Sequence, residues 1–98
     1  MALRQKLGAI FADRLRDVVL FGSYARGEAT EDSDVDVLVL VDGLTQLEMG
    51  AVATVATEHG LVHGVTIAPL PFSTQAFRAL SAAGRGLATE IERDGARP

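Results

Sequence analysis

The sequence predicts an α/β (α+β) fold, with a small mixed sheet of about three to four strands packed against helices in two layers. Short apolar runs rich in Val, Leu and Ile occur at Val18–Phe21, Val35–Val41 and Leu61–Leu70, as expected of buried strands. Segments with helical spacing lie before, between and after these runs. A chain of 98 residues can form one hydrophobic core, so we expect a single domain over 1–98.

The first helix is predicted over residues 3–16. Apolar side chains recur there at helical spacing and are expected to form one buried face: Leu3, Leu7, Ile10, Phe11 and Leu15. The first strand follows at Val18–Phe21, because this short run is rich in β-formers and ends at Gly22.

A turn and a loop separate the first two strands. Ser23 is placed to cap a short turn of helix that reaches Arg26, and Gly27 is expected to end that turn with a positive φ. Residues 28–33 are polar and predict a surface loop. The strand Val35–Val41 comes next.

The second helix is expected to begin after Thr45. Its apolar stripe comprises Leu44, Leu47, Ala51, Val52, Val55 and Ala56. We expect His59-Gly60 to close this helix, which would keep His59 and His63 off a common helical face. The sequence therefore does not predict a metal site at the histidine pair.

The third strand, Leu61–Leu70, is interrupted at Pro69 and followed by Pro71. Because proline lacks a backbone N–H, both positions suit the end or the edge of a sheet. Ser73 is expected to cap a third helix that contains Ala76, Phe77 and Leu80. A last helical turn is predicted around Ile91.

Composition excludes several classes of function. The net charge is −4 and no basic run is present, so an extended nucleic-acid footprint is not expected. The chain has no cysteine, which removes disulfides and thiolate metal sites. No apolar stretch resembles a signal peptide or reaches membrane length, so we expect a cytoplasmic protein.

The most informative motif joins a glycine-serine turn to two carboxylates. Asp34 and Asp36 are separated by one residue at the start of the strand Val35–Val41, so they are expected to share a face. Two neighbouring carboxylates repel each other, and a hard cation such as Mg²⁺ relieves that repulsion. Gly22 and Ser23 offer backbone N–H groups and a hydroxyl to a phosphate. This arrangement favours phosphoryl or nucleotidyl transfer.

The residues Gly22–Gly27, followed by Asp34-Val35-Asp36, resemble the nucleotidyltransferase superfamily that includes DNA polymerase beta. That superfamily has the signature Gly-Ser followed by Asp-x-Asp. The Gly-Ser-x-Ala-Arg-Gly form on a short chain is most similar to the minimal nucleotidyltransferases. The resemblance covers Val18–Val41, roughly a quarter of the chain. It implies a polymerase-beta-like nucleotidyltransferase core.

The resemblance also implies roles for individual residues. Asp34 and Asp36 would be catalytic and would hold Mg²⁺, while Gly22 and Ser23 would bind the triphosphate of an NTP, with ATP as the expected substrate. Arg26 would either contact the phosphates as well or pair with an acid and hold the loop. Minimal relatives commonly pair with a small helical HEPN protein, and in such toxin–antitoxin pairs the acceptor is a tyrosine of the toxin.

One departure from the family pattern leaves two hypotheses. Full nucleotidyltransferases carry a third acid on a later strand, but residues 61–77 contain no Asp or Glu. The first hypothesis is a Mg²⁺-dependent enzyme that moves an NMP group from NTP to a hydroxyl acceptor, and the intact motif favours it. The second is a catalytically weakened module that acts as an antitoxin or scaffold through surface contact, and the missing acid favours it.

Overall fold

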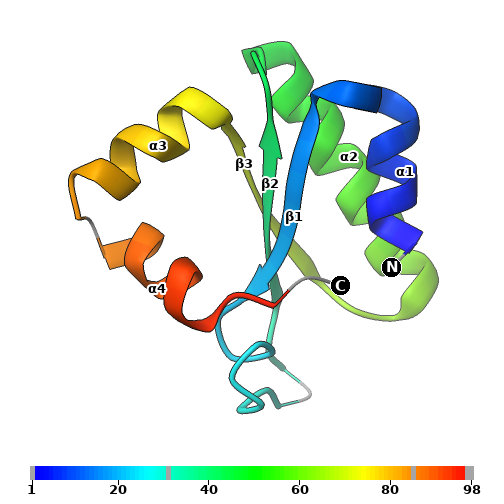
Figure 1. Ribbon diagram of the computed structural model, residues 1–98. Helices are drawn as coiled ribbons and strands as arrows, with labels where there is room; N and C mark the ends of the chain where they lie inside the picture. Colours follow the sequence, from blue (N-terminus) through cyan, green and yellow to red (C-terminus); the bar gives the residue numbers. More distant parts are fainter. Residues whose placement is uncertain (1, 31, 85, 97–98) are drawn as a thin grey trace.

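The computed structural model describes residues 2–30, 32–84 and 86–96 (Figure 1). Its elements, in chain order, are α1 (Ala2–Phe11), a 3-10 helix η1 (Ala12–Arg14), β1 (Leu15–Phe21), β2 (Val35–Val41), α2 (Gln46–His63), β3 (Ile67–Ser73), α3 (Thr74–Ala82) and α4 (Gly86–Asp94). No helix in the described ranges is both long and apolar enough to cross a membrane.

The sheet has the order β1-β2-β3 and is mixed, as the sequence predicts. β1 pairs with β2 in antiparallel orientation, and β2 pairs with β3 in parallel orientation. Val37, Leu38, Val39 and Val41 are at most 1% exposed, which is typical of a central strand covered on both faces. The apolar run Val35–Val41 therefore forms the strand that its composition predicts.

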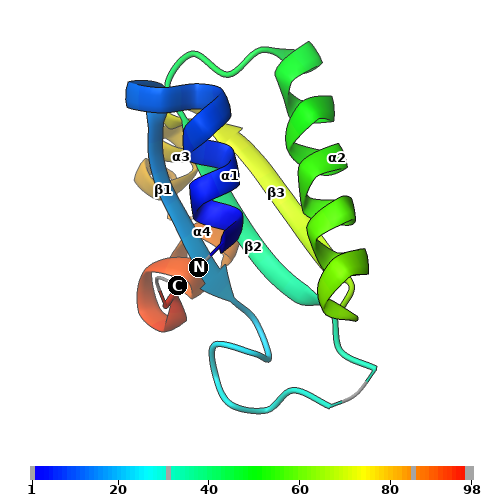
Figure 2. The same cartoon turned by 90° about the vertical axis from the view of Figure 1, so that its right-hand side faces the viewer.

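Helices cover both faces of the sheet (Figures 1 and 2). On one face, α1 and α2 enclose a core that includes Leu3, Leu7, Val37, Val39 and Val52. On the other face, α3 and α4 cover a second cluster that includes Val19, Leu38, Phe77 and Ile91. The sheet is thus the middle of three layers where the sequence analysis expects two, because the alternate positions of β2 are apolar as well and also need cover.

The first helix ends earlier than its apolar spacing predicts. α1 stops at Phe11, and Ala12 has a positive φ of 49° that breaks the helical path. Leu15, expected on the helix, opens β1 and pairs with Val41. Pairing with β2 therefore overrides the local helical pattern, and β1 begins three residues before the predicted Val18.

The second helix ends later than predicted. α2 continues through His63 and stops at Gly64, which adopts a left-handed φ of 70°. Gly60 does not close the helix: it allows close packing, since a Cβ there would lie 2.5 Å from the carbonyl oxygen of Val65. His59 and His63 consequently do share a helical face, with ring centroids 4.3 Å apart.

The histidine pair is part of the packing between α1 and α2. His59 is 6% exposed, and its Nδ1 lies 3.1 Å from Nζ of Lys6 on α1. Burial lowers the pKa of His59, and the nearby His63 and Lys6 lower it further. A neutral His59 that accepts a hydrogen bond from the Lys6 ammonium through Nδ1 keeps its remaining proton on Nε2. That nitrogen is then not available to a metal.

The third strand covers Ile67–Ser73 rather than Leu61–Leu70, because α2 takes up the first part of the predicted run. Both prolines lie inside β3, at the edge of the sheet. The N–H of Val35 donates to the carbonyl of Thr66 at 2.8 Å, so the even-numbered residues of this segment direct their backbone groups toward β2. Pro69 and Pro71 face away from β2, where no N–H is needed.

Arg14 joins three segments at one end of the sheet. Its guanidinium donates to both carboxylate oxygens of Glu48 at 2.8 Å and to the carbonyl oxygens of Asp42 and Gly43. Glu48 also accepts from the backbone N–H of Thr45, whose side chain caps α2 in return. The hydrogen bond from Arg14, with the smaller contribution of Thr45, lowers the pKa of Glu48 from 4.5 to about 2.

We predict that Glu48→Gln destabilises the fold in a pH-dependent way. The folded-state pKa lies below the unfolded value, so the stabilisation by the ionised Glu48 is fully present above about pH 4.5 and is lost as the pH falls toward about 2. Urea unfolding midpoints of wild type and variant should differ at pH 7 and converge near pH 2.5. Glu58→Gln, at an exposed position of the same helix, is the control. A gap that stays constant across this range would contradict the assignment.

Candidate active site

The two carboxylates lie where β2 begins. Asp36 is the second residue of β2 and is half-buried, whereas Asp34 immediately precedes the strand and is exposed. Asp36 is opposite Phe21 of β1 and Ala68 of β3 in the sheet register. Because side chains alternate along a strand, Asp36 lies on the same face as Leu38, which α3 and α4 cover.

The surroundings of Asp36 disfavour its ionised form. Burial raises the pKa of its carboxyl, and the charges of Asp34 and Glu90 raise it further, while Arg26 acts in the opposite direction. A cation between Asp34 and Asp36 would relieve this repulsion. The structure therefore brings the two predicted acids close enough to interact.

The glycine-serine turn packs directly against Asp36. Gly22 is buried and has a φ of 74°, and a Cβ at this position would lie 2.3 Å from Oδ2 of Asp36. Only a residue without a side chain lets the carboxylate approach the backbone in this way. The predicted phosphate cradle and the predicted cation site are thus in contact, although they are separated by a loop of the chain.

The segment from Gly22 to Gly27 forms consecutive turns rather than the short helix that the sequence predicts. The N–H of Arg26 donates to the carbonyl of Gly22, and the N–H of Gly27 donates to that of Tyr24. Gly27 has the expected positive φ, at 72°. Among the described residues, the Ser23 side chain caps no N–H group, so the predicted cap does not form.

Arg26 pairs with acids, which is one of the two roles that the sequence leaves open. Its Nη1 donates to Oε1 of Glu90 at 2.9 Å, and its Nε lies 3.3 Å from Oε1 of Glu28. Glu90 comes from α4, far away in sequence. The motif gives no signal for Glu90, because only the tertiary fold brings this helix to the turn.

The two carboxylates fit a Mg²⁺ ion that keeps water and phosphate ligands. The chemistry of the donors agrees with this ion, since both are hard oxygen ligands, and Mg²⁺ commonly takes one or two carboxylates. Across the described ranges, no three His, Cys, Asp or Glu side chains are arranged to hold a metal ion. Substrate phosphates and water would therefore have to supply the remaining ligands of a cation bound by the two carboxylates.

β3 supplies no acid beside the pair. The residue that pairs with Asp36 is Ala68, and Thr66 lies just before the strand with an exposed side chain. Ala68 shares the face of Asp36, since residues in register on neighbouring strands project to the same side. Thr66 lies before the paired residues and lines a pocket with Leu61 and Val65. β3 therefore places no carboxylate on the face of Asp36, as its sequence requires.

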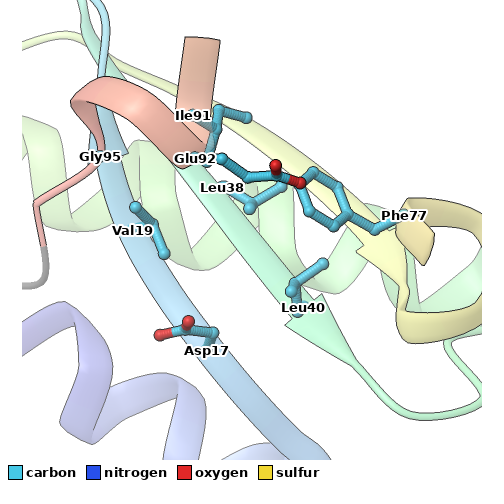
Figure 3. A pocket seen from close by; sticks show the side chains of 8 residues that line it. All are labelled: Asp17, Val19, Leu38, Leu40, Phe77, Ile91, Glu92 and Gly95. Atoms are coloured by element: carbon cyan, nitrogen blue, oxygen red, sulfur yellow. The ribbon is translucent and has the colours of Figure 1, made fainter. Parts of the chain in front are cut away.

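A separate cavity of about 240 Å³ lies farther along the same face of the sheet (Figure 3). Leu38, Phe77 and Ile91 form apolar parts of its wall, and Asp17 and Glu92 add carboxylates. Neither Asp34 nor Asp36 lines it. The two carboxylates at the start of β2 thus lie outside this cavity.

Comparison with known protein families matches residues 1–80 to the nucleotidyltransferase domain. A protein of Methanocaldococcus jannaschii, provisionally named a protein adenylyltransferase, is 40% identical over 68 residues, which are 68% of this chain and 69% of that protein. A second protein of the same organism, with the same provisional name, is 36% identical over 67 residues, or 68% of this chain and 63% of that protein. The matches thus span about two thirds of these relatives.

Two further similarities concern a named enzyme and solved structures. The protein adenylyltransferase MntA of Thermococcus cleftensis is 54% identical over 37 residues, 38% of this chain and 31% of that protein. A toxin–antitoxin crystal structure with AMP-PNP superposes with a TM-score of 0.66 at 22% identity, over 98% of this chain and 69% of that chain. A mutant of the toxin–antitoxin MntA-HpeT gives a TM-score of 0.62 at 19% identity, over 96% of this chain and 67% of that chain. These structures confirm the polymerase-beta-like fold.

We predict that Gly22→Ala costs more stability than Gly27→Ala. Both positions have a positive φ, so both variants carry the same backbone penalty, on the order of 1–2 kcal/mol. Only the Cβ at position 22 meets another atom, Oδ2 of Asp36, whereas nothing lies within 4 Å of position 27. Urea unfolding of the two variants measures the difference.

The same comparison in an Asp36→Ala background identifies the cause. Removing the carboxylate removes the atom that the new Cβ would meet, so Gly22→Ala and Gly27→Ala should then cost the same. Equal costs in the wild-type background would contradict a fixed contact between the Asp36 carboxylate and the turn.

Proposed function

Since the chain belongs to the nucleotidyltransferase domain family, we propose that it transfers an NMP group from an NTP, with ATP favoured, to a hydroxyl acceptor in a Mg²⁺-dependent reaction. One observation carries this proposal: the carboxylate of Asp36 rests against Gly22, so a cation site and a phosphate cradle share one surface. Phosphoryl and nucleotidyl transfer need this juxtaposition, because the metal must contact the phosphates that the cradle holds.

The proposed roles follow from the positions of the side chains. Asp34 and Asp36 provide the negative charge that attracts the cation, and Ser23 donates its hydroxyl to a phosphate oxygen. Bound Mg²⁺ would neutralise charge on the triphosphate and favour attack at the α-phosphorus. The acceptor hydroxyl gives its proton to solvent, and its oxygen forms a bond to the α-phosphorus while the bond from that phosphorus to the bridging α–β oxygen breaks. The NMP group is transferred, and pyrophosphate leaves.

The proposed acceptor is a tyrosine hydroxyl of a small helical HEPN-type partner protein, and the proposed location of the reaction is the cytoplasm. Relatives named protein adenylyltransferases support a protein acceptor. Toxin–antitoxin assemblies among the structural neighbours support a partner protein.

The end of α2 offers an apolar surface to such a partner. Leu61 and Val62 are 77% and 75% exposed. α2 leads through Thr66, whose carbonyl accepts from Val35, so this surface lies at the same end of the sheet as the acid pair (Figure 2). Exposed neighbouring apolar side chains commonly mark a protein contact. Their position supports a protein substrate over a small molecule.

A second candidate function is a catalytically weakened module that acts as an antitoxin or scaffold through surface contact. The alanine at position 68 favours it, because this position of β3 faces Asp36 and carries no carboxylate. The two candidates differ in what nucleotide binding accomplishes: both allow a bound NTP, but only the enzyme consumes it.

We predict that ATP binding depends on Mg²⁺ through Asp34 and Asp36. Calorimetry should show that Mg²⁺ strengthens ATP binding to the wild type and has little effect in the Asp34→Asn/Asp36→Asn variant, because the amides no longer attract the cation. Affinity in Mg²⁺ should fall by at least about tenfold, or roughly 1.4 kcal/mol.

Asp32→Asn is the matched control, since Asp32 is an exposed acid of the same loop. It should keep the affinity of the wild type. Metal-dependent binding that survives in the double variant, while circular dichroism shows it to be folded, would place the cation elsewhere.

A further inference from the structure

The helix α4 lies outside the part of the chain that matches the family, yet it reaches the candidate site. The match ends at residue 80, and α4 covers Gly86–Asp94. From this helix, Glu90 accepts a hydrogen bond from Arg26 at 2.9 Å. The two side chains are 33% and 35% exposed, so the ion pair lies at the surface of the site rather than in the core.

α4 is firmly held against the sheet, which makes Glu90 a fixed point. Ile91, the next residue, is 5% exposed and packs with Val19 and Leu38, while Ala88 is 1% exposed. After the helix, Ala96 exchanges two backbone hydrogen bonds with Leu20 of β1, at 2.7 and 2.8 Å. The helix is thus anchored on both sides of Glu90.

The turn that Arg26 belongs to is closed by backbone hydrogen bonds within the loop itself. The N–H of Arg26 donates to Gly22 at 3.2 Å, that of Gly27 to Tyr24 at 3.3 Å, and that of Glu28 to Ser23 at 2.8 Å. The Arg26 side chain therefore connects the backbone of the turn to the anchored helix. A turn that must present N–H groups to phosphates benefits from being ordered beforehand.

We propose that Glu90 is a positioning residue of the nucleotide site: its ion pair with Arg26 holds the Gly22–Gly27 turn in the shape that receives the triphosphate. This inference takes its ligand, the NTP, from the proposed function. It goes beyond that function by making α4, which the family match does not include, part of the site.

The charge of Glu90 and its contact with Arg26 predict opposite effects of its neutralisation on ATP binding. Glu90 is a negative charge near a site for a triphosphate, so its neutralisation would strengthen ATP binding if the charge acted only through space. If Glu90 acts by holding Arg26, its neutralisation weakens ATP binding. The sign of the change separates the two possibilities.

The first measurement is ATP affinity in the presence of Mg²⁺ for Glu90→Gln, Arg26→Gln and the double variant. Glu90→Gln should weaken binding by about 2- to 5-fold, the range of a surface ion pair. The double variant should bind no more weakly than Arg26→Gln alone, since both changes break one interaction. Glu92→Gln, which alters an acid of the same helix that bonds Ser81 instead, should bind as the wild type does.

The second measurement is amide hydrogen exchange without nucleotide. Glu90→Gln should increase exchange in residues 22–27 and leave that of β2 unchanged, whereas Glu92→Gln should leave both unchanged. Unchanged exchange in the turn, tighter ATP binding, or additive effects of Arg26→Gln and Glu90→Gln would overturn the proposal. If the wild type binds no ATP, the proposed function fails, and exchange alone decides whether Glu90 orders the turn.

Discussion

The register of β2 between its two neighbours fixes both the core and the candidate site. Val37, Val39 and Val41 face the core under α1 and α2, and the alternate residues face α3 and α4. A slip of one residue would exchange the two sets and drive the carboxylate of Asp36 into the α1–α2 core. The apolar side chains that stabilise the strand therefore also hold Asp36 at the open end of the sheet, opposite Phe21 and against the turn that follows β1.

Acidic and basic side chains meet at this end of the sheet. The charges of Asp34 and Glu90 both raise the pKa of Asp36, and Arg26, which pairs with Glu90, lowers it. In the proposed reaction, a metal–triphosphate complex would bring positive charge to the acid pair and negative charge to the turn. The interaction that links the two halves is the contact between Gly22 and Asp36, which needs a glycine with a positive φ.

The features predicted from sequence are those encoded in short segments. β2 and the Gly-Ser and Asp-x-Asp motif depend on neighbouring residues, so composition and spacing identify them. The ends of α1 and α2 depend on tertiary contacts: Leu15 joins β1 because Val41 is there to pair with it, and α2 extends past Gly60 because a glycine fits against Val65. Glu90 lies 64 residues from Arg26, and no local pattern marks it.

The central claim is that this surface transfers a nucleotidyl group. Its most direct test uses ATP labelled at the α-phosphate and, in a parallel reaction, at the γ-phosphate, with Mg²⁺ and a HEPN-type helical protein as the acceptor. Nucleotidyl transfer predicts that the α-label becomes covalently attached to a tyrosine of the acceptor while the γ-label leaves as pyrophosphate. Attachment of the γ-label, or no attachment of either label by a protein that binds ATP, would contradict it.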